Sequence, residues 1–560
     1  MNEVQKGERR SSVLACLKEE EQAAFRIWFD RAAGKEERIR EELCSVDDEK
    51  LPFIFSPQKE IRIDAVSGSG GSRLLFSRLL YLLTSGIDPN RILVILPSAF
   101  ERKIWHEKLE HFSLDKPVLA GPDAFLWNFL NENKENRSNL ERAGRGEGYE
   151  YSHLADEGLP DDAELDFRQL QAGTVPELID RFWLKMYVLF LKSGENTDFA
   201  GEKRELLQNA YRHYQVFLEH NRFFDLADLI NLSSLVLKDY PESARDRFDH
   251  VLMDDAQDYP QKLTGMLALF GKNVFFTGDS RKFPASGYSS QQKLENTYRF
   301  SHLMKKFIDL TAKEEIKVKA ERESLLAGYY LSETPQDAMK FISFMAAYMR
   351  EKHKIAFSEM AVLMRNKIGQ EALEERLKLM TVPYIDSRTH AVWRELKQAD
   401  LENVGTGFET LEALAKNLQA SPLLLSWLET YERQFPPFVL FGERLENLKV
   451  TREKMQEQEY GLSILGLDEL AGREFEMLFI PQFEEGIYPY MDLEREKAVL
   501  YRIFSRASRG FFLVRADTKR FKHQTTPTRE SSFMKKLFPE NIFECGDYFD
   551  WKKRALKLLK

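Results

Sequence analysis

The sequence is poor in cysteine and has no long apolar run. Its three cysteines, at positions 16, 44 and 545, lie far apart without CxxC spacing, which excludes a disulfide framework and a cysteine-based zinc or iron–sulfur site. No stretch approaches the roughly 18 unbroken apolar residues of a membrane helix, and the opening residues MNEVQKGERR lack the apolar centre of a signal peptide. We therefore expect a cytoplasmic protein that makes no use of a membrane.

Positive charge is also scarce. The chain carries 81 Lys and Arg against 90 Asp and Glu, a net charge of -9, which argues against a protein that coats nucleic acid through bulk charge but leaves room for a local basic groove. Residues 515–560 reverse the balance, with 12 basic and 6 acidic side chains. This basic tail either contacts phosphate or is a solvated helical end.

Short apolar runs alternate with helical periodicity over most of the chain. With 43% hydrophobic residues and a length of 560, the chain can form about three or four domains. From residue 61 the runs read IRIDAV, LLFSRLLYLL, RILVILP and ERKIWHEKLEHF, and later strand candidates are HVLMDD, NVFFTGD, MAVLMR, YGLSIL, EMLFIP and GFFLV. Strand and helix in alternation predict parallel sheets with crossover helices, here two α/β units that are each split by an insertion.

Two segments depart from this alternation of strand and helix patterns. Residues 12–45 have apolar side chains at helical spacing, so they form an amphipathic helix or helical pair that either packs on the main body or protrudes to bind a partner. Residues 131–166 contain 11 acidic against 4 basic side chains and few large apolar ones, which predicts a flexible acidic loop.

A glycine-rich turn follows the first strand candidate. Residues 65–73 read AVSGSGGSR, and glycines at this place let backbone N–H groups converge on phosphate at a helix N-terminus. A complete P-loop has a lysine before its Ser or Thr, but here Gly71 precedes Ser72. The turn alone is weak evidence, because any tight connection between strand and helix can use glycine.

Acidic residues end the next two strand candidates of this unit. Asp254 and Asp255 follow VLM, and Asp279 follows the run NVFFTG. One carboxylate at such a strand end can coordinate Mg²⁺ while its neighbour orients or deprotonates a water. An acidic strand end that faces solvent is the alternative.

The order of these segments resembles that of the UvrD/Rep family of superfamily 1 DNA helicases. FDLADLI is similar to the family's DFDDLL, DDAQD to DEAQD and GDSRK to GDxxQ. MAVLMR with ALEERL and VPY, LAGREF with FEEGIYP, and LYRIFSRA continue the family's order towards the C-terminus. The likeness covers residues from about 60 to 537, and six or more motifs in the right order make coincidence very improbable.

The resemblance implies a fold and a domain plan. The fold is α/β, with two RecA-like P-loop NTPase domains, each a parallel sheet with flanking helices, and helical insertions. The expected boundaries are 1–51 for a helical N-terminal extension, 52–125 and 220–300 for the first domain, 126–219 for a helical insertion, 301–395 and 455–540 for the second domain, 396–454 for a reduced second insertion, and 541–560 for the basic tail.

It also implies a nucleotide site that uses ATP and Mg²⁺. Ser72 and Asp254 would hold the metal, and two arginines would reach phosphate across a cleft or, alternatively, form structural salt bridges between domains. The implied catalytic residues are Asp254, Asp255, Arg365 and Arg506, and the implied nucleotide-binding residues are Gly68, Gly70, Gly71, Ser72, Arg73 and Glu474.

Several positions depart from the family's pattern. Gly71, Asp255 and Lys282 stand where the family has the P-loop lysine, the glutamate and the glutamine that serve hydrolysis. Loss of a positioned cation at the phosphoryl group costs on the order of 3 to 5 kcal/mol, and Arg73 starts one residue late and would point along the helix. The DNA-contacting motifs are altered at 96–100 and 121–125, and no glutamine before the turn matches the one that reads adenine.

Three functions are compatible with these motifs. The first is a helicase-like protein with impaired ATP hydrolysis that works on DNA, preferably single-stranded, in repair, recombination or defence, as a DNA-binding or scaffolding subunit beside a nuclease or another helicase. The second is an active, divergent ATP-dependent translocase. The third is a helicase-like factor associated with RNA polymerase, suggested by the N-terminal extension and the small second insertion.

Overall fold

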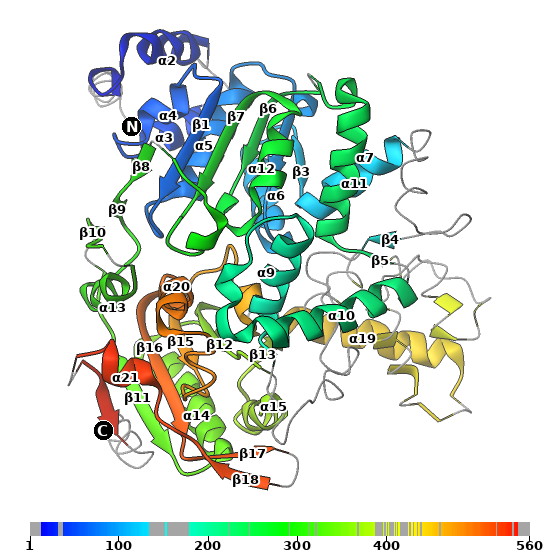
Figure 1. Cartoon of the computed structure of the whole chain (residues 1–560), viewed down its shortest axis with the longest axis vertical. Helices are drawn as coiled ribbons and strands as arrows, with labels where there is room; N and C mark the ends of the chain where they lie inside the picture. Colours follow the sequence, from blue (N-terminus) through cyan, green and yellow to red (C-terminus); the bar gives the residue numbers. More distant parts are fainter. Residues whose placement is uncertain are drawn as a thin grey trace. The chain divides into compact units, whose positions relative to one another are not determined.

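The computed structural model describes residues 13–546 apart from 32–36, 134–151, 154–178, 387–391, much of 393–438 and isolated positions elsewhere. The chain divides into two compact units (Figure 1). Unit 1 is Met1–Ser324 with Ala471–Arg473 and Pro489–Arg506, and unit 2 is Leu325–Leu470 with Glu474–Tyr488 and Ala507–Lys560.

Unit 1 is built on a sheet of six strands in the order β3-β2-β6-β7-β1-β8, and every neighbouring pair is parallel. All four residues of β2 are buried, as expected for a strand in a parallel sheet that helices cover on both faces. The strands are β1 (Glu60–Ala65), β2 (Ile92–Ile95), β3 (Val118–Ala120), β6 (Phe248–Met253), β7 (Gly271–Gly278) and β8 (Gln292–Leu294).

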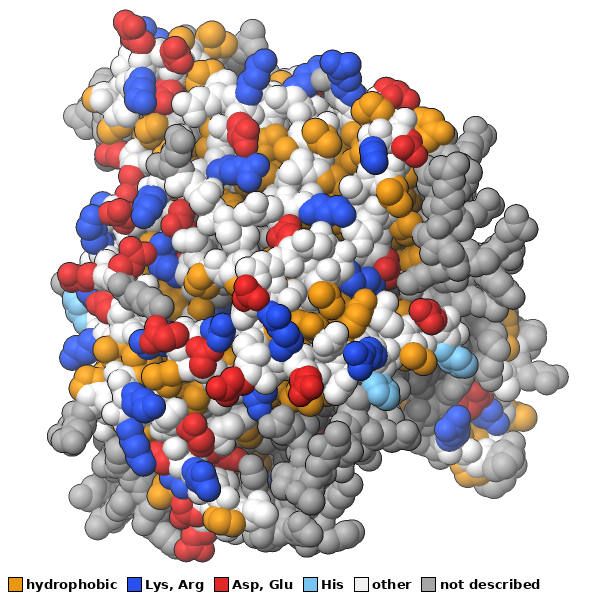
Figure 2. Space-filling view, viewed as in Figure 1, with side chains coloured by type: hydrophobic (Ala, Val, Ile, Leu, Met, Phe, Trp, Pro, Cys, Tyr) orange, Lys and Arg blue, Asp and Glu red, His pale blue; other side chains and the backbone are white. Residues whose placement is uncertain are grey.

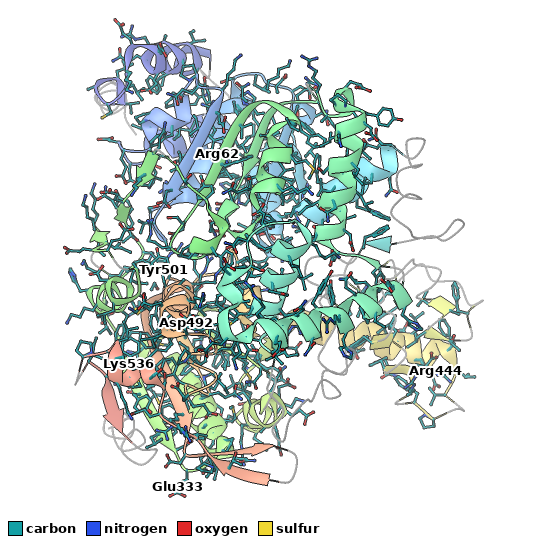
Figure 3. All side chains as sticks on the ribbon, viewed as in Figure 1. Arg62, Glu333, Arg444, Asp492, Tyr501 and Lys536 are labelled. Carbon is teal, nitrogen blue, oxygen red and sulfur yellow. The ribbon has the colours of Figure 1, made fainter. Side chains whose placement is uncertain are left out.

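Several helices of unit 1 begin at polar side chains that cap their first turn. The side chain of Asp492 accepts a hydrogen bond from the backbone N–H of Arg495 (3.1 Å) at the start of α20, the helix that carries Tyr501 (Figure 3). The helices are α5 (Gly71–Thr84), α6 (Ala99–His111), α7 (Pro122–Glu132), α9 (Arg181–Lys192), α10 (Arg204–Asn221), α11 (Leu226–Asp239), α12 (Gln261–Ala268), α13 (His302–Ala312) and α20 (Leu493–Phe504); the short strands are β4 (Ser152–His153), β5 (Phe223–Phe224), β9 (Asn296–Thr297) and β10 (Lys317–Val318).

Three N-terminal helices pack on this unit. They are α2 (Glu19–Arg31), α3 (Glu37–Cys44) and α4 (Leu51–Phe55). The buried rings of Phe25 and Trp28 contact Phe55, and the indole N–H of Trp28 donates to the hydroxyl of Thr84 at 2.7 Å. In the described part of 12–45 the helical pair is therefore packed on the main body, not extended as an arm.

Unit 2 has its own sheet, of seven strands in the order β13-β14-β12-β15-β16-β11-β19, again with all neighbours parallel. The strands are β11 (Ala327–Ser332), β12 (Met360–Leu363), β13 (Tyr384–Asp386), β14 (Leu462–Leu465), β15 (Phe475–Ile480), β16 (Ala507–Ala516) and β19 (Glu544–Gly546), with a separate hairpin of β17 (Thr518–Phe521) and β18 (Gln524–Pro527); the helices are α14 (Pro335–His353), α15 (Gln370–Leu379), α19 (Phe441–Gln458) and α21 (Ser532–Lys536).

The two parallel sheets with flanking helices confirm the predicted α/β class of RecA-like domains. The exact domain boundaries stay a prediction, and α20 falls in unit 1 although it lies within the 455–540 range assigned to the second domain. Most of the acidic segment 131–166 and of the basic tail 541–560 lies outside the described residues. In the 396–454 segment, described leucines such as Leu411, Leu428 and Leu448 form a small apolar core.

No described helix is both long and apolar enough to cross a membrane. Charged side chains of both signs are interspersed over the face of the molecule shown in Figure 2.

Candidate functional site

The glycine-rich turn joins the end of β1 at Ala65 to the start of α5 at Gly71. Gly68 and Gly70 have φ values of +79° and +84°, in the left-handed region that favours glycine. A Cβ on Gly68 would also lie only 2.3 Å from the Thr297 hydroxyl oxygen, so no larger residue fits there. The turn therefore has the backbone and the placement at a helix N-terminus that suit a phosphate.

Position 71 has no cation, and the next basic residue is engaged elsewhere. A Cβ on Gly71 would lie 3.0 Å from the Cβ of Ala65 and 3.8 Å from that of Thr277. The Arg73 guanidinium binds the carboxylate of Glu42 at 3.2 Å and the hydroxyl of Ser45 at 2.9 Å. Arg73 therefore points to the end of α3 and does not replace the missing ammonium.

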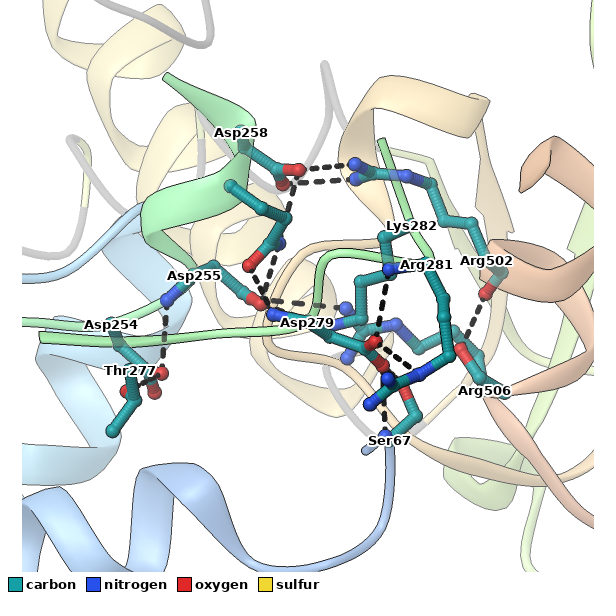
Figure 4. Close-up of polar contacts among 12 residues, drawn as sticks. Ser67, Asp254, Asp255, Asp258, Thr277, Asp279, Arg281, Lys282, Arg502 and Arg506 are labelled. Atoms are coloured by element: carbon teal, nitrogen blue, oxygen red, sulfur yellow. Dashed lines mark hydrogen bonds and ion pairs between the residues drawn. The ribbon is translucent and has the colours of Figure 1, made fainter. Parts of the chain in front are cut away.

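Asp254 follows β6 and is buried beside Ser72. Its Oδ1 accepts hydrogen bonds from the Thr277 hydroxyl (2.7 Å) and from the backbone N–H of Asp255 (2.9 Å) (Figure 4). Among the described residues its Oδ2 has no hydrogen-bond partner. Burial and the Asp255 charge raise the pKa of Asp254, against the lowering effect of the Ser72 and Thr277 hydroxyls. A hydroxyl beside a carboxylate with a free oxygen is a donor set that fits Mg²⁺ completed by phosphate and water.

Asp255 is held by two cations. Its side chain lies 2.8 Å from the Lys282 ammonium and 3.9 Å from the Arg506 guanidinium, and it accepts a hydrogen bond from the Gln257 amide at 3.0 Å (Figure 4). Burial alone would raise the pKa of Asp255, but Lys282 and Arg506 outweigh burial and hold the pKa well below its usual range. Asp255 therefore stays ionised, and the positive charges of Lys282 and Arg506 balance its negative charge.

Glu101 is a third carboxylate at the same site, and the sequence analysis did not single it out. It lies buried in the first turn of α6, where its backbone N–H donates to the Ser98 side chain at 3.2 Å. Burial, Asp254 and Asp255 raise the pKa of Glu101 well above its usual value. The available signal was an acid in the first turn of the helix that follows β2, which is the sheet neighbour of β6.

Residues of α20 and the turn after it reach the same strand ends. The Tyr501 hydroxyl donates to Asp279 at 2.7 Å, and Asp279 also accepts from the backbone N–H and the hydroxyl of Ser67, each at 2.8 Å. Both terminal nitrogens of Arg502 bind the carboxylate of Asp258, one of them at 3.0 Å (Figure 4). These contacts tie the glycine-rich turn and the acidic strand ends to the segment that ends at Arg506.

The remaining two candidates belong to unit 2. Arg365 donates from Nη1 to the backbone oxygen of Ile487 at 2.7 Å and lies 4.9 Å from the ring centroid of Tyr488. Glu474 is exposed, just before β15. The structure thus groups Gly68, Gly70, Gly71, Ser72, Asp254, Asp255 and Arg506 within unit 1, turns Arg73 aside, and places Arg365 and Glu474 in unit 2.

Comparisons with known proteins point to helicases. The family model described as "UvrD/REP helicase N-terminal domain" matches residues 128–283. The "Putative ATP-dependent DNA helicase YjcD" of Bacillus subtilis (strain 168) is 22% identical over 384 residues, which are 61% of this chain and 49% of that protein. The chain thus spans about half the length of the curated relative it matches.

A solved structure was also matched. It is the C-terminal domain of a possible DNA helicase from the Lactobacillus strain WCFS1, with 12% identity, 44% of this chain and 98% of that chain covered, and a TM-score of 0.24. A TM-score at this level carries no argument about the fold.

Proposed function

We propose that this chain, as a member of the UvrD-like helicase family, acts on DNA and that its unit 1 retains an ATP site in which hydrolysis is weak or lost. Its role would be that of a DNA-binding or scaffolding subunit in repair, recombination or defence. The partners that fit this role are single-stranded DNA and a nuclease or a second helicase.

The pairing of Asp255 with Lys282 is the observation that carries the proposal. A base that activates water must accept a proton near neutral pH. Asp255 is a weak base because its pKa is lowered by the buried Lys282 ammonium at 2.8 Å and by Arg506. The missing cation at Gly71 removes a second contribution, since charge on the transferred phosphoryl group is stabilised mainly by positioned cations.

Binding of ATP is better supported than its hydrolysis. The backbone of 67–72 would hold phosphates, Ser72 and Asp254 would hold Mg²⁺, and Arg506 would bind a terminal phosphate oxygen. Mg²⁺, when bound, would neutralise part of the phosphate charge. Two nitrogens of Arg506, Nε and Nη2, make no hydrogen bond to the described residues and can serve this purpose. Arg365 and Glu474 are the proposed contributions of unit 2.

An active translocase is the second candidate. The observation in its favour is the intact group of Ser72, Asp254 and Arg506. It requires Lys282 to release Asp255 when ATP and DNA are bound.

An ATPase assay with and without single-stranded DNA separates the two candidates. We expect turnover near background in both conditions, and the same result for Asp254→Ala. DNA-stimulated turnover above about 1 per second, lost in Asp254→Ala but kept in Asp249→Ala, would establish the active translocase instead. Asp249 is a suitable control because it makes ion pairs with Arg91 and Lys272 at the partly exposed start of β6.

A further inference from the structure

The segment 42–50, which comprises the end of α3 and the connection to α4, lies on the glycine-rich turn. The Lys50 side chain is only 2% exposed, and its ammonium lies 3.1 Å from the position that a Cβ on Gly70 would occupy. The ammonium binds the Asp47 carboxylate at 2.5 Å and lies 4.9 Å from the ring centroid of Tyr298. Tyr298 is itself joined to the turn, because its backbone N–H donates to the Gly68 oxygen at 3.0 Å.

The same segment holds Arg73. Glu42 and Ser45 bind its guanidinium at 3.2 Å and 2.9 Å. Residues 42–50 thus contact both Gly70 and Arg73 at the start of α5. All of these contacts lie within unit 1.

The two sides of the turn differ in what they offer a ligand. On one side, Ser72 meets Asp254 and the strand ends of the sheet, which is where Mg²⁺ and the terminal phosphates of a nucleotide would lie. With the terminal phosphates beside Asp254, the sugar and base of a bound nucleotide would extend away from it. Gly70 and Arg73 border that second side, and residues 42–50 lie on it.

We propose that residues 42–50 occupy the place of the nucleoside, so that in this conformation the turn accepts a bare polyphosphate but not a nucleotide. This inference rests on the proposed function in one respect, namely that the turn binds phosphate. Only the small fraction of molecules in which the segment has moved away can then bind ATP. The apparent ATP affinity is the intrinsic affinity multiplied by that fraction. Displacement is feasible because the Arg73 side chain is 47% exposed and its ion pair with Glu42 is therefore weak.

The test compares two ligands on the full chain. ATP and inorganic tripolyphosphate, each with Mg²⁺, are titrated by calorimetry into the parent protein and into two variants, Lys50→Ala and the double variant Glu42→Ala with Ser45→Ala. We expect ATP affinity to rise by about tenfold or more in Lys50→Ala and by a smaller factor in the double variant. Tripolyphosphate affinity should stay within about twofold in all three proteins.

Lys116→Ala is the matched control, because it removes a lysine from an exposed ion pair, with Glu110, elsewhere in unit 1. It should leave both affinities unchanged. Circular dichroism melts show whether Lys50→Ala is folded, and the double variant, which changes only partly exposed side chains, keeps the test decisive if it is not.

Two results would overturn the inference. In the first, ATP affinity is unchanged or falls in both variants, while tripolyphosphate still binds the parent. This result would show that the segment does not exclude the nucleoside or that Lys50 is itself a phosphate ligand. In the second, neither ATP nor tripolyphosphate binds to any of the proteins, which would overturn the phosphate site as a whole. DNA binding, measured separately, would still bear on the rest of the proposed function.

Discussion

Lys282 and Asp255 form a buried ion pair whose two members depend on each other. Their side chains are 8% and 10% exposed, so removal of the ammonium leaves a buried carboxylate with only the more distant Arg506 to neutralise it. We predict that Lys282→Met lowers the free energy of unfolding by about 3 kcal/mol. Lys317→Met, which breaks the exposed pair with Glu295, should change it by less than about 1 kcal/mol.

Urea denaturation of both variants at pH 7 tests this prediction. The depressed pKa of Asp255 stabilises the fold above the carboxyl's unfolded pKa, and this stabilisation is lost as pH falls towards the folded value. The difference between parent and Lys282→Met should therefore shrink in acid. Equal losses in the two lysine variants would contradict a special role for the buried pair.

The ionisation of Glu101 should change stability with pH in the direction opposite to that of Asp255. Its pKa is raised in the folded state, so the folded chain binds a proton more tightly than the unfolded one. Stability is then lost as pH rises from the unfolded value of about 4.3 through the raised folded value. We predict that Glu101→Gln unfolds at a higher temperature than the parent at pH 8 and that the gain fades near pH 4.

The control for this pH series is Glu107→Gln, on the same helix, where the side chain is 62% exposed. Its melting temperature should follow the parent's at every pH. A parallel pH profile for Glu101→Gln and the parent would mean that the carboxyl is not protonated in the folded chain.

Gly71 allows a direct test of the lost cation. We predict that Gly71→Lys raises ATP affinity by about tenfold or more, at about 1.4 kcal/mol per decade, because Ser72, Asp254 and Arg506 are already in place. The added Cβ lies 3.0 Å from that of Ala65, so the double variant Ala65→Gly with Gly71→Lys removes the crowding. Calorimetry on both variants measures the gain.

An unchanged ATP affinity in Gly71→Lys and in the double variant would mean that the missing lysine is not what limits ATP binding. If Arg506→Ala also had a lower free energy of unfolding than the parent without nucleotide, Arg506 would serve a structural ion pair and not a nucleotide site. Arg365→Ala, in unit 2, extends the same comparison to the second arginine.

At the scale of elements, the buried bidentate ion pair of Arg502 with Asp258 helps to attach α20 to the acidic strand ends of unit 1, beside the Tyr501 contact with Asp279. Arg502 is 4% exposed and Asp258 15%, so Arg502→Met should cost about 3 to 5 kcal/mol of unfolding free energy, because it strands a partly buried carboxylate. Arg495→Met, on the same helix, removes an exposed pair with Asp492 and should cost less than about 1 kcal/mol. Similar urea midpoints for the two would contradict this account of the attachment.

The elements themselves were largely predictable. The runs IRIDAV, RILVILP and NVFFTGD became β1, β2 and β7 because continuous apolar runs between turn residues suit strands that are buried on both faces. Short strands such as β3, β8 and β19 were not predicted. Each has only three residues, so there is little local pattern, and pairing with a long neighbour is what makes them strands.

At the scale of the whole molecule, net charge limits how the chain can bind DNA. A balance of -9 means that any binding relies on local phosphate contacts and base stacking. We predict weak, salt-sensitive binding to single-stranded DNA with little sequence preference, measured by fluorescence anisotropy across a salt series. Nanomolar binding by the isolated protein at physiological salt would contradict the prediction, and no binding at low salt would favour a pure scaffold.

The sequence by itself determined the α/β class, the phosphate-type turn without its lysine, the acidic strand ends and the resemblance to UvrD/Rep helicases. These depend on local pattern and on motif order, both of which survive in a linear chain. Only the tertiary structure decided that Glu101 joins Asp254 and Asp255, that Lys282 neutralises Asp255, and that Lys50 lies on the turn. The physical reason is that the sheet order β2-β6-β7-β1 brings together strand ends far apart in sequence, and burial there turns separate charges into one coupled cluster.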